Sequence, residues 1–311
     1  MKSADWLKHS AWKLVTEQKG NVIAVAALSM VAMLAIGGLV VDGGSLYVAR
    51  MQMQKAANAA ALSGAQELTT DQTSVEAVAR HVLHQHKEEE GIDVLDIRMK
   101  DSVTVGLTRE VPLGFAGIFG IKSTPVSVSA TAQLGIMGEA KGAAPIGIDD
   151  RTELVYNQIY TLKVEPGGQQ SGFFGILALD GPGASTYSDN LRYGYKGLVK
   201  LDDIIDTQTG NIAGKTREAI EERIRNCPYP EGEMHHRDCP RVLLVPVYKP
   251  YDQNSNQLKK VRITGFAYFY VIGMEKDNDT YIKGKFIERV GTGIVDPGAA
   301  GKGAFSIRLT E

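Results

Sequence analysis

The sequence predicts an α+β protein with a membrane anchor, and three observations carry that prediction. The first is an apolar stretch of twenty residues without a charge, from Val22 to Val41. The second is the run from Asp42 to Leu68, which is rich in Ala, Met, Gln and Leu, all good helix formers. The third is a change to a period of two after residue 92, which is typical of β-strands. We therefore expect one long helix followed by mainly β structure.

The uncharged stretch, residues 22–41, has the length of a transmembrane helix. At about 1.5 Å of rise per residue it reaches roughly 30 Å, the thickness of the hydrocarbon core of a bilayer. Only Arg50 and Lys55 follow closely, whereas residues 1–21 carry Lys2, Lys8, Lys13 and Lys19. Because positive charge accumulates on the cytoplasmic side, we expect residues 1–21 in the cytoplasm and the rest of the chain outside the membrane.

A cleaved secretory signal is the competing interpretation of this stretch. The apolar part of a signal peptide runs about 7–15 residues and precedes a cleavage site of small residues. Here the stretch is longer, and the flank from Asp42 to Leu46 offers no such site. The sequence therefore favours a signal-anchor, which makes a single-pass protein of the cell membrane.

Residues 42–137 read as a helical spine followed by a small sheet. A second helix is expected from a capping box at Thr73 to Glu76, with its end at Gly91. Alternating apolar and polar residues at 103–107 and 126–134 predict antiparallel strands with one wet face. The apolar segment 113–121 between them is expected to form a turn or short helix.

Residues 138–146 contain Gly, Ala and Pro and are expected to be a linker. Beyond it, residues 147–311 are expected to form a mainly β extracytoplasmic domain with one helix, Thr216 to Asn226. The stretch Val261 to Ile272 is apolar on both faces and is the predicted central strand. The other expected strands are 159–164, 173–179, 198–205, 242–248, 281–290 and 305–309.

The N-terminal region resembles that of TadE/TadG-like proteins. The elements that carry the resemblance are the uncharged span, Val41-Asp42-Gly43, Tyr47-Val48-Ala49-Arg50 and the run from Gln54 to Leu62, in that order. This family is associated with assembly of tight-adherence (Flp) pili. The resemblance implies that residues 42–137 form a pilin-like α+β unit. It also implies two kinds of partner, the lipid bilayer and other Tad/Flp pilin-like subunits or assembly machinery.

The spine carries small residues at helical spacing. Ala57, Ala61 and Ala65 lie four apart, and Gly64 belongs to the adjacent row. Such rows let another backbone approach closely, so we expect them to contact a partner helix. The alternative is that they pack against the protein's own sheet. Asp42 is expected at the membrane surface, either hydrated or facing a cation such as Arg50 of a neighbour.

Cys227 and Cys239 are expected to form a disulfide, because paired cysteines in an exported chain are usually bonded. Free thiols, or a metal held with His235 and His236, are the alternatives. The metal is disfavoured because adjacent histidines in a strand point to opposite sides and no C-x-x-C spacing exists.

Other motifs do not reach the pattern that their chemistry requires. Gly210 to Thr216 has three residues between its glycines where a phosphate loop has four, so it is interpreted as a turn that caps a helix. Asp180 to Ser185 lacks the hydroxyls of a metal-dependent adhesion site and is expected to be a tight turn. The net charge of −2 favours no nucleic-acid surface. We expect no enzyme activity, no nucleotide, no bound metal and no cofactor.

The resulting hypothesis is a membrane-anchored, pilin-like assembly component that acts structurally. Two alternatives stay open: a membrane-tethered adhesin or ligand-binding module, and a tethered extracytoplasmic hydrolase. Calcium-dependent binding to surfaces would favour the first and labelling by a hydrolase probe the second. Loss of fimbriae on gene deletion would favour assembly.

Overall fold

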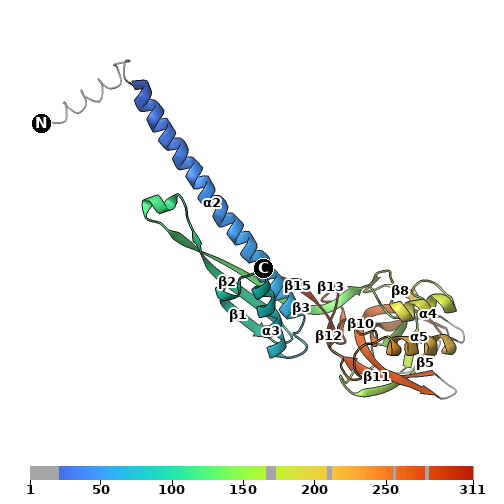
Figure 1. Cartoon of the computed structure of the whole chain (residues 1–311). Coiled ribbons are helices and arrows are strands. Elements are labelled where there is room, and N and C mark those ends of the chain that lie inside the picture. The colour runs from blue at the N-terminus through green and yellow to red at the C-terminus, as the bar shows by residue number, and fades with distance from the viewer. Residues whose placement is uncertain (1–20, 166–172, 209–211, 255–256, 277–279, 311) are drawn as a thin grey trace.

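The computed structural model describes residues 21–165, 173–208, 212–254, 257–276 and 280–310. The fold is α+β, as predicted: a long N-terminal helix followed by mainly β structure. Figure 1 shows the helix α2 extending away from the folded body, which holds the sheets and the shorter helices. Apart from Asn21, the predicted cytoplasmic segment 1–21 lies outside the described residues.

The predicted anchor and spine form one unbroken helix, α2, Asn21–Ala65. Among the described residues, it is the helix long and apolar enough to cross a membrane. Up to Val41 its large apolar side chains are exposed. Beyond Asp42 one side packs against the first sheet. The change in composition at Asp42 therefore marks a change of environment within one helix.

The first sheet is built on a meander of β1 (Ile92–Arg98), β2 (Ser102–Pro112) and β3 (Ser123–Ala140). The predicted alternation is confirmed, because one face of β2 and β3 is buried against α2. The C-terminal strand β15 (Ala304–Leu309) pairs antiparallel with β3, and β12 (Arg289–Val290) pairs parallel with β15. Residues near the end of the chain thus complete the N-terminal sheet.

The helix α3 (Gln72–Gln85) packs against α2, but its cap differs from the expected one. Asp71 is the N-cap, and its carboxylate accepts a hydrogen bond from the backbone N–H of Ser74 at 2.9 Å. Glu76 instead pairs with Arg80 at 2.8 Å. An Asp is as good an N-cap as a hydroxyl residue, and here it begins the helix. The helix ends before Gly91, which closes the short 3₁₀ helix η1 (Glu89–Gly91).

The expected linker at 138–146 is partly strand, because β3 continues to Ala140 and β4 (Ile146–Asp149) begins at its other end. Gly138, one of the glycines that suggested a flexible segment, instead permits close packing. A side chain placed there would collide with Asp296, and one placed at Gly135, just before the segment, would collide with Val295. The end of β3 also pairs with β7 (Val199–Lys200) and β13 (Gly293–Val295). The two parts of the chain are therefore joined through a shared strand.

The second sheet closes on itself. Its pairs run from β10 through β11, β5, β6, β4 and β9 back to β10. The central role predicted for Val261 to Ile272 is confirmed, since this stretch lies in β10, which pairs with β9 and β11. We call this closed sheet the barrel. Its remaining bounds are β5 Ile159–Glu165, β6 Phe173–Ile176, β8 Ile204–Asp206, β9 Val242–Asn254, β10 Gln257–Lys276, β11 Thr280–Ile287 and β14 Ala300–Gly301.

Two helices accompany the barrel where one was expected: α4 (Ala184–Tyr193) and α5 (Ala213–Arg225). The polar composition of α4 concealed it, although Tyr187 and Leu191 are buried one turn apart. The two helices are tied together by Arg223, which is buried and donates to the backbone oxygens of Leu191 and Pro240. Burial lowers the pKa of Arg223 to about 10.

Candidate assembly site along the long helix

The inner side of α2 is defined by its small residues. Ala57, Ala61 and Ala65 have no exposed surface and belong to the core that α2 forms with β2 and β3. Gly64 faces α3, where a Cβ would lie 3.3 Å from the Cβ of Ala79. These four residues were expected to contact a partner helix. The structure corrects that expectation: small side chains bring α2 close to the protein's own sheet and to α3.

The opposite side of α2 carries exposed apolar residues just beyond the uncharged stretch. Tyr47, Val48 and Met51 are 66%, 53% and 53% exposed. Gly44 lies on the same side, and no atom lies within 4 Å of a Cβ placed there. We call these four residues the outer face. Tyr47, Val48 and Met51 were not among the predicted site residues, although their helical spacing after Asp42 was a readable signal.

Asp42 holds α2 to the loop between β2 and β3. Its Oδ1 accepts hydrogen bonds from the backbone N–H groups of Gly114 and Phe115, at 2.8 and 3.2 Å. Its Oδ2 accepts one from Ala116 at 2.7 Å, where the 3₁₀ helix η2 (Ala116–Phe119) begins. Backbone donors at a helix start suit a carboxylate.

This arrangement corrects the expected role of Asp42. Its carboxylate is buried and accepts hydrogen bonds from its own chain, where a hydrated carboxylate or one facing a neighbour's arginine was expected. Arg50, the other charged residue selected on α2, is exposed.

The segment that contains α2 matches a known protein family. Residues 20–67 match the family model described as putative Flp pilus-assembly TadE/G-like. This segment is TadE/G-like. The match covers all of α2 that the structure describes, with Asp42, the inner side and the outer face, and it supports a part in Flp/Tad pilus assembly. Neither a curated protein nor a solved structure matches the chain.

The end of the TadE/G-like segment is held to the barrel by the loop that Cys227 and Cys239 close. The disulfide between them is present, with a Cα–Cα distance of 5.2 Å. From this loop, Arg237 donates to the backbone oxygen of Gln66 at 3.1 Å. Arg289 donates to the backbone oxygens of Met234 and His236, each at 3.0 Å. We call residues 228–238 the disulfide loop.

Two charged groups at this junction, Asp238 and Arg289, have pKa values that are lowered by their surroundings. The hydroxyl of Tyr229 donates to Asp238 at 2.7 Å, and this hydrogen bond lowers the pKa of Asp238. Burial lowers the pKa of Arg289. A cavity of about 250 Å³ lies between the loop, the end of the TadE/G-like segment and β12, lined in part by Thr70, His235 and Arg289.

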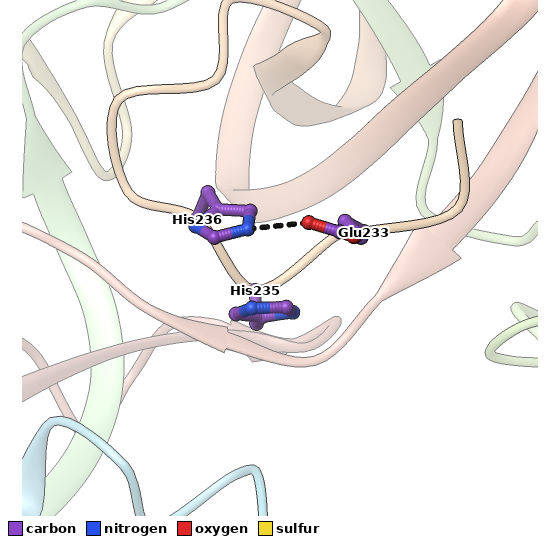
Figure 2. Close-up of side chains that lie close together, drawn as sticks. All are labelled: Glu233, His235 and His236. Carbon is purple, nitrogen blue, oxygen red and sulfur yellow. Dashed lines mark hydrogen bonds and ion pairs between the residues drawn. The ribbon is translucent and has the colours of Figure 1, made fainter. Parts of the chain in front are cut away.

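The disulfide loop also gathers three groups of the kind that bind metals, shown in Figure 2: Glu233, His235 and His236. One ligand atom from each lies within 4.8 Å of the others. The expectation that the two histidines point apart is wrong, because this segment is not a strand and the ring centroids are 4.0 Å apart.

Two of these three groups already bind each other. Glu233 is hydrogen-bonded to His236 at 2.8 Å, and Tyr229 stacks on the His236 ring at 3.5 Å. A cation would have to replace the hydrogen bond. We therefore interpret the cluster as an element that orders the disulfide loop.

The other two motifs, residues 210–216 and 180–185, have structural roles where the structure describes them. The hydroxyl of Thr216 is buried and bonded to Tyr187 at 3.0 Å, and Lys215 pairs with Glu218 at 3.1 Å. Gly210 lies outside the described residues. The expected turn at Asp180 is present, with Gly181 and Gly183 at positive φ, and it leads into α4.

Proposed function

We propose that the protein is a single-pass membrane component of Flp/Tad pilus assembly that acts structurally, through packing of α2 with other pilin-like subunits or assembly proteins. The N-terminus lies in the cytoplasm and both sheets lie outside the membrane. The four lysines before the span support this orientation, and the disulfide suits an oxidising compartment. The family match to residues 20–67 supports the pilus context.

The observation that carries the proposal is the outer face. Ten residues separate Val41 from Met51, so the apolar side of α2 continues for about 15 Å beyond the uncharged stretch. The exposed side of a helix that packs on a sheet is usually polar. Here it presents Tyr47, Val48 and Met51 instead, and Gly44 leaves room for another backbone. The helix therefore offers a second packing side after its inner side is filled.

The proposal assigns the barrel a supporting role and no chemistry. Its histidines are engaged in the disulfide loop, and Lys215 is paired with a carboxylate. The disulfide loop instead fixes the end of α2, because Arg237 donates to the backbone oxygen of Gln66. Arg289 of β12 holds the loop in turn through the backbone oxygens of Met234 and His236.

A matched pair of valines tests the proposal. Val48 on the outer face and Val155 in the connection between β4 and β5 are 53% and 56% exposed, so a charge at either should leave the fold intact. In cells that lack the native gene, we expect Val48→Glu to insert and fold but to fail to restore surface pili. Val155→Glu should restore them. Normal pili with Val48→Glu would contradict assembly through the outer face.

A further inference from the structure

We propose that the loop between β2 and β3 enters the outer leaflet of the bilayer beside α2, which gives the protein a second membrane contact. We call residues 113–121 the hairpin tip. Figure 1 shows the β2–β3 hairpin reaching back along α2 toward its N-terminal half. The partner is therefore a lipid surface, and the inference rests on the membrane-spanning role of residues 22–41.

The contact between Phe115 and Gly38 sets the position of the hairpin tip along α2, and hence its depth in the bilayer. Its ring covers Gly38: a Cβ placed on Gly38 would lie 2.6 Å from the Phe115 Cγ. Gly38 precedes Asp42 by four residues, or about 6 Å along the helix axis, and lies inside the uncharged stretch. When α2 spans a bilayer, Phe115 is therefore at the level of its apolar region.

The Asp42 carboxylate keeps the hairpin tip at this depth. Its three hydrogen bonds go to consecutive residues of the tip, so the tip cannot slide along α2 without breaking them. They also meet a requirement of the apolar phase, where unsatisfied backbone groups cost several kcal/mol. Backbone N–H groups throughout the tip are bonded, among them those of residues 113, 114, 115, 116, 118, 120 and 121.

The side chains of the hairpin tip match the interior of a membrane rather than water. Ile118 and Phe119 are 78% and 81% exposed, and Ile121 is also exposed. Residues 113–121 contain no charge, and the first charged residue after them is Lys122, which is exposed. An apolar segment followed by a lysine is typical of chains that lie at the interface between membrane and water, where the ammonium group reaches the lipid headgroups. The tip adjoins the lipid-facing part of α2, so lipid is the occupant already present at that position.

The test uses the full chain in phosphatidylcholine vesicles that contain lipids with nitroxide groups on the acyl chain. Both native cysteines are disulfide-bonded, so a single introduced cysteine takes a fluorophore. We expect a probe at Phe119→Cys to be quenched several-fold more than one at Ser127→Cys, an exposed control on β3. Equal quenching at the two positions would overturn the proposal.

Neighbouring glycines supply a second arm. Gly38→Leu would displace Phe115, whereas Gly37→Leu meets no atom within 4 Å. Quenching at position 119 should fall in the first variant and persist in the second; persistence in both would contradict a depth set by Gly38. A probe at position 119 that is shielded only after another protein is added would show a protein partner and overturn the lipid assignment. Because the vesicles hold this protein alone, the result does not depend on pilus assembly.

Discussion

The two sides of α2 beyond Asp42 differ in what covers them. The inner side carries alanines that are fully buried against β2, β3 and α3, while the outer face exposes Tyr47, Val48 and Met51. One side of the helix thus belongs to the core of the protein, and the other side is a free apolar surface. The difference shows that a row of small residues marks close packing without saying which chain supplies the neighbour. In this protein the neighbour of the small residues is its own sheet.

The largest part of the fold is expected to respond to a bulky residue on the inner side. Ala57→Leu adds volume to a filled core, and we expect a loss of about 1–3 kcal/mol in the free energy of unfolding of the N-terminal unit. Ala59→Leu, on a partly exposed position of the same helix, should change it by less than about 0.5 kcal/mol. Thermal or denaturant unfolding of the detergent-solubilised protein measures both. If the two variants were equally stable, the inner side of α2 would not be part of a tightly packed core.

A smaller part of the fold, the disulfide loop, is expected to respond to a change where the end of α2 meets this loop. Replacing Cys227 and Cys239 with Ala removes a closed loop whose cross-link stabilises by roughly 3 kcal/mol in the chain-entropy model, with strain able to reduce it. The disulfide loop should then become sensitive to protease, and its contact from Arg237 to Gln66 should weaken. Limited proteolysis with and without reductant checks this. A loop that resists protease in the Ala variant would show that other contacts order it.

The smallest part of the fold, the hairpin tip, is expected to respond to a change at the membrane end of the same helix. Asp42→Asn keeps the shape of the side chain but replaces one acceptor oxygen with an NH₂ group, which cannot accept from the backbone of the hairpin tip. We expect a cost of about 1–3 kcal/mol in local stability, the usual penalty for a buried donor without a partner. Hydrogen exchange at the amides of Gly114, Phe115 and Ala116 should accelerate, while exchange in β10 stays unchanged. Unchanged hydrogen exchange at these three amides would show that the hydrogen bonds of Asp42 do not hold the hairpin tip.

The regular parts of the fold were predictable from local patterns. The uncharged stretch predicts a helix through its length and apolar composition. The alternation at 103–107 and 126–134 and the double-sided apolar run in β10 predict strands through burial. The disulfide was predictable as well, because the chain holds only two cysteines and the part that carries them was predicted to lie outside the membrane.

Long-range pairing was not predictable in the same way. The glycines near 138 look like a linker until Val295 and Asp296 pack against them, and no local signal places the C-terminal strand beside β3. The same holds for Asp42. Its charge was noticed, but the backbone donors it binds come from residues more than seventy positions away.

The central claim is that the outer face of α2 contacts other subunits, while its inner side serves the fold. Photo-crosslinking in assembling cells tests it most directly, with the reactive residue at Met51 and a control at Tyr193, which is exposed on α4. The account predicts that Met51 links to another pilin-like or assembly protein and that Tyr193 does not. Normal pili with no intermolecular link from Met51 would contradict it.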